Sequence, residues 1–367
     1  MKFMKDKKIR VLQLKNSIQH YSLPALNIVA EYCDFTVLYF DEARTKKEVL
    51  DQCKFKTIFV PVRKVWKFFI HKKNIREICQ DYDVVISLGT IQYLSYTALA
   101  FGMRKFKLIQ YGIGEPASYH RHYGEASKLY YSISHAIEKR SDALLFYSPQ
   151  GIVLHEQRGY TQTKMFVANN TTEVLKRPLV PQSKDSILFI GMLYPQKGLQ
   201  ILLEAYSVAY SRNKEIVPLN IVGGGSPLPE VKEWVKSNNL ESVIHVLGPI
   251  YDNEKKADIF QHSLACISPK QAGLSVLESM GYGVPFITDA NAITGGEAFN
   301  IKHGENGLRI ENLDVNKMVE IILDITANQD KYVEMGKKAY EHYWTLCKPS
   351  DMAQGQLDAI NYVMNLK

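Results

Sequence analysis

The stretch from 264 to 288 carries the residues best suited to bind an anion. An apolar run at 264–268 leads into a Pro-Lys-Gln-Ala-Gly loop, and a helical pattern then begins near Leu274. Gly273 lets a bound group approach the backbone, and the free N–H groups of Leu274, Ser275 and Val276 would point toward that group. Because such donors and the helix dipole both favour negative charge, this helix start predicts a phosphate site.

Glu278 lies one helical turn beyond the predicted phosphate site, on the same face as Leu274. A carboxylate so near a phosphate is better suited to accept hydrogen bonds from sugar hydroxyls than to contact the phosphate. The alternative is an ordinary surface helix whose glutamate is solvated. Taken alone, this stretch favours that alternative. Other parts of the chain are needed to distinguish a phosphate site from a surface helix.

Two further glycine-bearing turns, at 191–198 and 223–225, follow apolar runs in the same half of the chain. In a parallel sheet such turns lie at the carboxyl edge, where open α/β sheets bind ligands. Lys197 adds a cation to the first turn, so the three turns together favour a phosphate-bearing ligand. None fits GxGxxG or GxxxxGK[ST], which leaves a dinucleotide fingerprint and a P-loop unsupported.

The elements that position these turns are short strands alternating with helices, which predicts parallel sheets covered on both faces. Expected strands lie at 9–14, 35–40, 56–60, 84–88, 106–110, 143–147, 165–168, 186–190, 218–222, 244–247, 264–268 and 284–288. Expected helices lie at 23–32, 74–81, 92–101, 198–210, 228–238, 253–261, 316–327, 330–343 and 349–364. Two prolines among the polar residues of 175–185 mark a linker.

The chain of 367 residues is long enough for two such domains. We expect a first domain at 1–178, a second at 179–346, and a C-terminal helix at 347–367 that crosses back to the first. An apolar content of 46% is ordinary for a soluble globular protein, and no apolar run reaches membrane-spanning length. The five cysteines are scattered and form no CxxC, so we expect reduced thiols, no zinc site and a cytoplasmic location.

Positive charge is concentrated in the first part of the chain. Residues 1–150 carry 24 Lys and Arg against 14 Asp and Glu, a net charge of +10, whereas residues 151–367 carry 21 against 24, a net charge of −3. This asymmetry predicts an anionic surface or substrate that is met by the first domain only.

Five blocks stand in ordered succession between 186 and 345. They are FIGMLYPQKGLQILLEAY (189–206), NIVGGGSPLPEVKEW (220–234), VLGPI (246–250), KQAGLSVLESMGYGVPFIT (270–288) and HGENGLRI (303–310). In this order and spacing they resemble the donor-binding domain of retaining glycosyltransferases of the large glycogen-synthase-like family, family four. The resemblance implies a GT-B fold, in which two Rossmann-like domains with parallel sheets face each other across a cleft.

The family's roles carry over to matching positions of this chain. The resemblance implies that Lys197 contacts the diphosphate of a nucleotide-sugar donor and that Glu278 binds the nucleotide ribose, which makes these two residues the main catalytic-site candidates. It implies no metal and no other cofactor. The remaining donor-site positions are Gly191, the turn of Gly223, Gly224 and Gly225, the base-contacting Pro249 and Ile250, and the diphosphate-binding Gly273, Leu274 and Ser275.

Two positions depart from the family's pattern. Met192 stands where an arginine is usual, five residues before Lys197, and Lys270 stands where a first glutamate is usual, eight residues before Glu278. One hypothesis is that Lys270 restores the missing positive charge and that Glu297 accepts the sugar hydroxyls instead. The alternative is that Lys270 is a solvated loop lysine and Glu297 a surface residue.

The first domain resembles the family in architecture only. Its first loop, Lys15-Asn16-Ser17-Ile18-Gln19-His20, replaces a glycine-rich one, and Ser87-Leu88-Gly89-Thr90 stands where a histidine is often found. Candidate acceptor groups are the segment 110–115, which ends in Glu115, and the cluster His120, Arg121 and His122. Glu115 or a histidine such as His120 could serve as a base for the acceptor hydroxyl.

The stretch 62–76 mixes six Lys and Arg with large apolar side chains. Written as a helix, it places Val62, Trp66, Phe69 and Ile70 on one face, which predicts an interfacial helix on an anionic membrane. The alternative is a core-facing helix with a solvated basic side. The expected membrane-side residues are Arg63, Lys64, Trp66, Lys67, Phe69 and Lys72.

These observations predict a retaining glycosyltransferase that moves a sugar from a nucleotide-sugar donor to a glycan or polyprenyl-linked acceptor. We expect it to act in cell-surface polysaccharide synthesis, in the cytoplasm or peripherally on the inner face of the membrane, and without nucleic acid as a partner. Two alternatives stay open: a nucleotide-sugar epimerase of similar fold, and a non-catalytic scaffold that binds sugar nucleotides.

Overall fold

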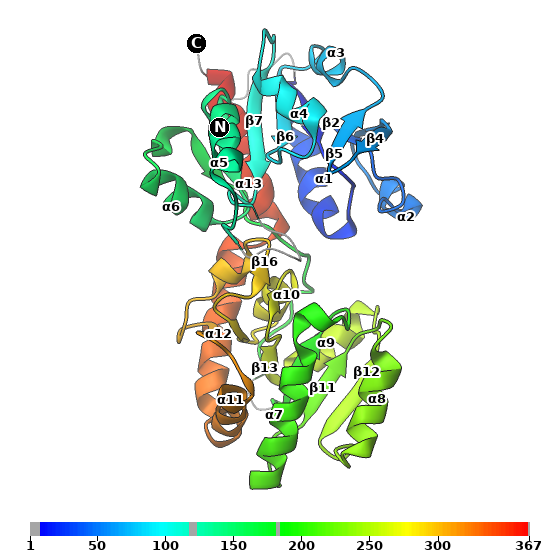
Figure 1. Ribbon diagram of the computed structural model, residues 1–367, viewed down its shortest axis with the longest axis vertical. Coiled ribbons are helices and arrows are strands. Elements are labelled where there is room, and N and C mark those ends of the chain that lie inside the picture. The colour runs from blue at the N-terminus through cyan, green and yellow to red at the C-terminus, as the bar shows by residue number, and fades with distance from the viewer. Residues whose placement is uncertain (1–7, 117–122, 181–183, 366–367) are drawn as a thin grey trace. The chain divides into compact units, whose positions relative to one another are not determined.

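The computed structural model of the chain describes residues 8–116, 123–180 and 184–365, which form two compact units (Figure 1). Among these residues, unit 1 comprises 8–116, 124–172 and 348–365. Unit 2 comprises Tyr123 and the described residues between 173 and 347. The chain therefore passes from unit 1 to unit 2 after Thr172 and returns after Cys347.

Unit 1 is built on a parallel sheet of seven strands among its described residues, in the order β3-β2-β1-β6-β7-β8-β9. The strands are β1 (Arg10–Leu14), β2 (Asp34–Tyr39), β3 (Lys56–Phe59), β6 (Val84–Leu88), β7 (Lys107–Gly112), β8 (Ala143–Phe146) and β9 (Met165–Val167). Neighbouring residues of β1 alternate between two buried cores, with Val11 in one and Leu12 in the other. This double burial is why the strands read as continuous apolar runs.

Helices cover both faces of the unit 1 sheet. The face of Val11 packs against α1 (Leu23–Tyr32) and α13 (Pro349–Asn365). The face of Leu12 packs against α3 (Ile75–Cys79), the α4–η2 segment (Leu94–Thr97 and Ala98–Ala100) and Ile137 of α5 (Lys128–Lys139). The other elements of unit 1 are α2 (Lys47–Leu50), α6 (Pro149–Gln157), η1 (His20–Ser22) and η3 (Gln162–Lys164).

The C-terminal helix α13 returns to unit 1, as predicted, and lies among its elements in Figure 1. It contacts α1 and the strands from β6 to β9. Gly355 permits the closest approach, because a Cβ atom at this position would overlap the carbonyl oxygen of Val167 in β9. The end of the chain thus completes the core of the unit in which the chain began.

Unit 2 repeats this plan with six parallel strands among its described residues, in the order β12-β11-β10-β13-β15-β17. The strands are β10 (Ser186–Ile190), β11 (Leu219–Val222), β12 (Ile244–Gly248), β13 (Ser263–Ile267), β15 (Phe286–Asp289) and β17 (Gly307–Ile310). Two short strands, β14 (Gln271–Ala272) and β16 (Ile293–Thr294), form a separate pair. The two parallel sheets confirm the predicted fold class.

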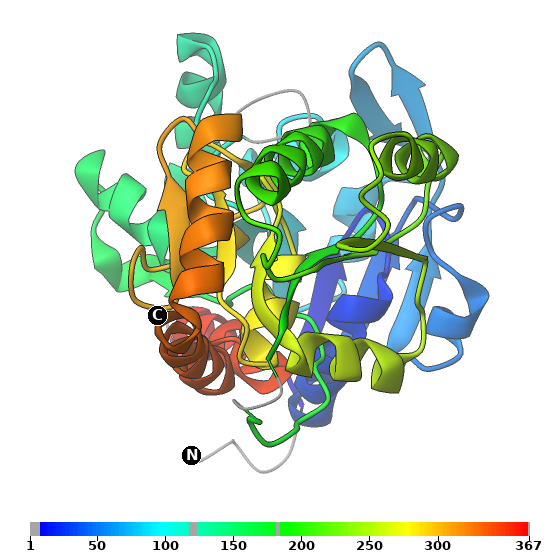
Figure 2. The same ribbon diagram turned by 90° about the horizontal axis from the view of Figure 1, so that it is seen from below.

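The helices of unit 2 also divide between the two faces of its sheet. Figure 2 shows α7 and α8 on one side and α9 on the other. One core includes α7 (Leu199–Arg212), α8 (Leu228–Ser237) and α11 (Val315–Ala327). The other includes α9 (Asn253–Gln261), α10 (Ser275–Gly281) and α12 (Gln329–Leu346). Two short turns, η5 (Pro195–Lys197) and η6 (Glu297–Asn300), complete the unit.

The prediction of an interfacial helix over 62–76 is wrong. This stretch forms an antiparallel hairpin of β4 (Val62–Val65) and β5 (Phe68–His71), followed by the start of α3. Alternation along the strands turns Val62 and Phe69 toward the core of unit 1 and Ile70 away from it. The apolar residues also fit a helical spacing, but their β-branched and aromatic types favour strands.

No helix in the described part of the chain is both long and apolar enough to cross a membrane.

His71, at the end of the hairpin, gives unit 1 a pH-dependent stability. Its ring is buried, stacks on Tyr96 at 4.6 Å and lies 3.1 Å from the Tyr96 hydroxyl through Nε2. Burial lowers the pKa of His71 to about 4. Between pH 6.5 and 4 the unfolded chain therefore binds a proton that the folded chain does not. Stability contributed by the neutral ring is lost as the pH falls through this window.

We expect the variant His71→Gln to lose less stability than the wild type between pH 6.5 and 4, by about 2 kcal/mol. Denaturant unfolding at a series of pH values measures this difference. His245→Gln, at an exposed position of β12, serves as the control and should follow the wild-type pH dependence. Equal slopes for His71→Gln and the wild type would contradict the prediction.

Candidate functional site

The carboxyl edge of the unit 2 sheet brings together the three glycine turns that the sequence singled out. The turn after β10 is hydrogen-bonded to the turn after β11, since Leu193 N–H donates to the Gly224 carbonyl at 2.8 Å. It is also joined to the loop after β13, since Lys270 N–H donates to the Lys197 carbonyl at 3.1 Å. Gly224 lies against Pro249 of the loop after β12. Four successive loops therefore form one continuous surface.

Two of the glycines are required by this packing. Gly191 has a φ of 125°, and a Cβ atom there would overlap the Nζ of Lys197. At Gly223 a Cβ atom would overlap the carbonyl oxygen of Gly191. The missing side chains thus leave room for the lysine and for the close approach of two loops.

Lys197 is buried beneath this surface, with 7% of its area exposed. Its Nζ donates to the carbonyl of Ile190 at 3.2 Å and lies 5.7 Å from the centre of the Phe189 ring. Burial lowers the pKa of Lys197, and the neighbouring Cys266 and Glu278 partly offset this effect. A cation that has lost most of its water in this way interacts strongly with an anion that reaches it.

The start of α10 supplies two free donors rather than the predicted three. The N–H of Val276 donates to the Gly273 carbonyl at 2.9 Å, so it does not point at a ligand. The N–H groups of Leu274 and Ser275 have no acceptor among the residues that the structure describes. Gly273 has nothing within 4 Å of the position of a Cβ atom, which leaves open space in front of these two donors.

Glu278 is not the solvated surface glutamate of the alternative interpretation. Its Oε1 lies 2.8 Å from the Nζ of Lys256 in α9. The side chain of Glu278 is 19% exposed and that of Lys256 is 21% exposed. The sequence pointed to Glu278 but not to Lys256, because Lys256 follows another lysine, Lys255, in an ordinary polar helix and no motif distinguishes the two.

The predicted base-contacting residues follow β12 at the same edge. Pro249 carbon atoms lie from 3.4 Å to 3.8 Å from a Cβ position at Gly224. Ile250 is half-buried against the core that also contains α10. The structure therefore places Pro249 and Ile250 on the surface formed by the glycine turns.

Lys270 is a partly exposed loop lysine, with 43% of its side chain exposed, and it has a buried partner. Its Nζ lies 3.1 Å from Oδ2 of Asp289 and 3.4 Å from the Leu313 carbonyl. Burial alone would raise the pKa of Asp289, but hydrogen bonds from Asn291 N–H, Leu313 N–H and Lys270 lower it below its ordinary value. The charge of Lys270 is thus already balanced. Its role as a replacement cation stays a prediction.

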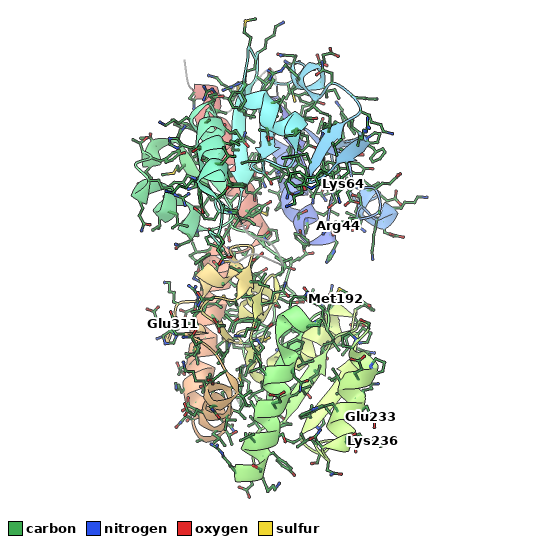
Figure 3. The ribbon with its side chains drawn as sticks, in the orientation of Figure 1. Arg44, Lys64, Met192, Glu233, Lys236 and Glu311 are labelled. Carbon is green, nitrogen blue, oxygen red and sulfur yellow. The ribbon has the colours of Figure 1, made fainter. Side chains whose placement is uncertain are left out.

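Met192, at the position of the missing arginine, lies at the surface of its unit (Figure 3). Its side chain is 64% exposed and therefore has few protein contacts to hold it in place. The thioether can offer an anion no positive charge.

Glu297 is buried rather than on the surface, with 5% of its area exposed. Its Oε2 accepts hydrogen bonds from Gly295 N–H at 2.9 Å and from the Thr294 hydroxyl at 3.3 Å. The carboxylate therefore accepts its hydrogen bonds from the loop that leads directly into η6. Its proposed contact with sugar hydroxyls stays a prediction.

In unit 1, Glu115 belongs to a buried network. Its Oε1 forms an ion pair with Arg158 of α6, and its Oε2 accepts a hydrogen bond from the Tyr131 hydroxyl at 2.9 Å. Both contacts hold the carboxylate in one position. The predicted cluster of His120, Arg121 and His122 lies outside the described residues.

Lys15 is a buried cation of unit 1 to which the sequence pattern assigned no role. It follows β1 at the carboxyl edge of the sheet, it is 8% exposed, and its ammonium has no acceptor among the described residues. Burial lowers its pKa to about 8. Its own N–H and carbonyl are taken by Leu38 and Tyr96. Its only signal in the sequence is a basic side chain in the first loop, where the family usually has glycines.

No group of His, Cys, Asp and Glu side chains in the described part of the chain is arranged to hold a metal ion.

The part of the sequence that forms this surface is similar to known proteins. The model of the family "Glycosyl transferases group 1" matches residues 170–342. This part of the chain is therefore similar to the group 1 glycosyl transferases. The match confirms the resemblance carried by the five sequence blocks, and it covers the whole of the surface formed by the glycine turns.

Curated relatives show what kinds of protein share this region. D-rhamnosyltransferase WbpZ of Pseudomonas aeruginosa is 31% identical over 161 residues, which are 42% of this chain and 40% of that protein. A poly(ribitol-phosphate) alpha-N-acetylglucosaminyltransferase of Staphylococcus aureus is 25% identical over 186 residues, which are 48% of this chain and 36% of that protein. The chain thus spans about half the length, or less, of these relatives.

Solved structures show that the fold extends over both units. Anabaena Alr3699/HepE, crystallised with UDP, matches with a TM-score of 0.71 and 16% identity, over 96% of this chain and 100% of that one. S. aureus TarM matches with a TM-score of 0.67 and 12% identity, over 96% and 99% of the two chains. The fold is accordingly the GT-B fold of the group 1 glycosyltransferases.

The two glycines Gly223 and Gly273 should respond differently to alanine. We expect Gly223→Ala to lower the thermal unfolding midpoint, because its Cβ would force two loop backbones apart. Gly273→Ala should leave the midpoint close to that of the wild type, because its Cβ would enter open space. Differential scanning calorimetry compares the two variants.

The same two variants distinguish an effect on stability from an effect on ligand binding. If a bound group lies against Gly273, Gly273→Ala weakens nucleotide binding at unchanged stability. A Gly223→Ala protein as stable as the wild type would contradict the packing described above.

Proposed function

We propose that the protein is a retaining glycosyltransferase that moves a sugar from a nucleotide-sugar donor to a glycan or lipid-linked acceptor. One observation carries the proposal. The buried ammonium of Lys197, the two free N–H groups at the start of α10 and the carboxylate of Glu278 all belong to one edge of the unit 2 sheet. A cation, backbone donors and an acceptor carboxylate are the groups that a nucleoside diphosphate requires.

Each group has a role in the proposed reaction. The bond between the sugar and the diphosphate breaks, and negative charge develops on the leaving phosphate oxygen. Lys197 and the N–H groups of Leu274 and Ser275 stabilise that charge without reorganising, because packing already fixes their positions. Glu278 accepts hydrogen bonds from the ribose and so sets the place of the diphosphate. The acceptor hydroxyl then attacks from the same side as the leaving group and gives its proton to the departing phosphate oxygen, so that the products are the glycoside and the nucleoside diphosphate and the configuration is retained.

The relatives support a polymeric acceptor and a role in cell-surface polysaccharide synthesis. One relative is named for a rhamnosyl transfer and another for the transfer of N-acetylglucosamine to poly(ribitol-phosphate). The net positive charge of residues 1–150 supports an acidic acceptor or acidic surroundings on the unit 1 side.

Donor turnover tests the proposal. We expect release of a nucleoside diphosphate from one member of a panel of nucleotide-sugars, and Lys197→Met should lower the rate by about a hundredfold or more. Lys232→Met, at an exposed position of α8, is the matched control and should leave the rate unchanged. The anomeric configuration of the product, followed by NMR, tests retention.

Other outcomes identify the alternative functions. Conversion of the donor sugar to its epimer, with the nucleotide still attached, would indicate an epimerase. Binding of the nucleotide-sugar without any turnover would indicate a non-catalytic scaffold, for which the exposed Met192 is the best argument.

We further propose that the enzyme works peripherally on the inner face of the cell membrane, with the β4–β5 hairpin as the contact. The hairpin tip exposes Trp66 by 74% and Val65 by 45%, and its outer face exposes Ile70 by 41%. Trp66 also has a φ of 55°, an uncommon backbone angle for a bulky residue. An indole that is held in solvent at such an angle suits the interface of a bilayer.

Basic side chains surround these apolar ones. Arg63, Lys64, Lys67 and Lys72 form no ion pair within the described part of the chain, and the Nζ of Lys67 lies 4.8 Å from the centre of the Trp66 ring. Figure 3 labels Lys64 on the hairpin. Unpaired cations around an exposed apolar tip are complementary to anionic lipid headgroups. Phe69, by contrast, is half-buried and packs on Tyr93 at 5.5 Å, so it belongs to the core and not to the contact.

Sedimentation with lipid vesicles tests the contact. We expect binding to vesicles with 30% phosphatidylglycerol, little binding to pure phosphatidylcholine, and a loss of about tenfold or more for Trp66→Ser or for Arg63→Gln with Lys67→Gln. A variant carrying Lys232→Gln and Lys236→Gln, two exposed lysines of α8, removes the same charge elsewhere. Equal binding to both kinds of vesicle, or to neither, would refute the membrane contact.

A further inference from the structure

The carboxylate of Glu278 is held by a residue outside the family's motif. Lys256 places its Nζ 2.8 Å from Oε1 of Glu278, and both side chains are about four-fifths buried. The second oxygen, Oε2, has no donor among the residues that the structure describes. The ion pair therefore occupies one oxygen and leaves the other for a ligand.

The position of Lys256 follows from the way α9 begins. Asp252 caps this helix, because its side chain accepts hydrogen bonds from Glu254 N–H at 2.9 Å and Lys255 N–H at 3.0 Å. The N–H of Lys256 donates to the Asp252 carbonyl at 3.0 Å. The helix starts directly after the base-contacting loop of Pro249 and Ile250. Lys256 is thereby fixed between that loop and Glu278.

The charges around Glu278 make this pairing more than a surface contact. Glu278 forms an ion pair with Lys256, and its charge also acts on the buried Lys197. One carboxylate thus interacts with two ammonium groups. Without Lys256, the negative charge of Glu278 would face the diphosphate of the ligand and repel it.

The two positions that depart from the family's pattern do not supply a second cation beside Glu278. Met192 is uncharged and exposed, and Lys270 is paired with the buried Asp289. Lys256 is the unassigned lysine that touches a predicted ligand-binding group. Its partner carboxylate is also the one expected to recognise the ribose.

We propose that Lys256 is a positioning residue for nucleotide recognition. It holds Oε1 of Glu278 so that Oε2 accepts hydrogen bonds from the ribose hydroxyls, and it offsets the charge of Glu278 beside the diphosphate. The inference rests on the proposed function, because it concerns the nucleotide of the same donor. It makes the preference for ribose over deoxyribose a property of the Lys256–Glu278 pair.

Calorimetric titration of the full-length protein with UDP, GDP and ADP and with their 2′-deoxy and 3′-deoxy forms tests this role. For the nucleotide that binds, we expect the wild type to prefer the ribose form by about tenfold or more over at least one deoxy form, which corresponds to about 1.4 kcal/mol. Lys256→Met should reduce this preference to about threefold or less, whereas Lys256→Arg should retain most of it.

The neighbouring Lys255 provides the matched control. It lies one position earlier in α9, it is exposed and it forms no ion pair within the described part of the chain, so Lys255→Met should keep the wild-type preference. Glu278→Gln should lose the preference as Lys256→Met does, and combining the two should cause little additional loss. A purely structural role of Lys256 would lower all affinities equally and leave the ratio unchanged.

The outcomes separate this inference from the proposed function. An unchanged ratio in Lys256→Met, with nucleotide binding and donor turnover retained, overturns the inference and leaves the glycosyltransferase proposal standing. A wild type that binds none of the nucleotides overturns both.

Discussion

The buried ammonium of Lys197 is the group around which the glycine turns of unit 2 are packed. It needs the Ile190 carbonyl as acceptor, and it needs a glycine at 191 because any side chain there would occupy its place. It also needs a nearby negative charge, because an isolated buried cation is costly to desolvate. Glu278 supplies part of that charge. A diphosphate would supply the rest, which links the stability of the site to its occupation.

The same constraint explains why the glycine turns interlock. A parallel sheet brings the ends of β10, β11, β12 and β13 to one edge, so their loops compete for limited space. Gly223 resolves one such conflict by letting the Gly191 carbonyl approach its backbone. The loops can then exchange main-chain hydrogen bonds, and Lys197 is held by rigid neighbours. A rigid arrangement of donors is what the stabilisation of a leaving phosphate demands.

Unit 1 and unit 2 share a plan but differ in what could be predicted from their residues. In unit 2 the strands β10, β11, β12, β13 and β15 were predicted to within about two residues, because glycines stand where several of these parallel strands end, whereas β14, β16 and β17 were not predicted. In unit 1 the sheet was predictable but the stretch 62–76 was not. Its apolar residues fit the periods of a helix and of a strand, and the pairing between β4 and β5 decides for the strand. The exposure of Trp66 at the turn is likewise a consequence of that pairing.

The sequence by itself determined the resemblance to the glycosyltransferase family, the parallel α/β fold and the candidates Lys197, Gly273 and Glu278. These follow from local patterns, since apolar runs, glycines and motif spacing are written along the chain. Tertiary structure alone decided which charges are paired. Lys270 lies with Asp289, Glu278 with Lys256, and Glu115 with Arg158. The partners of each pair are 19, 22 and 43 positions apart. Such pairs form only when strands and helices pack, so no spacing along the chain could reveal them.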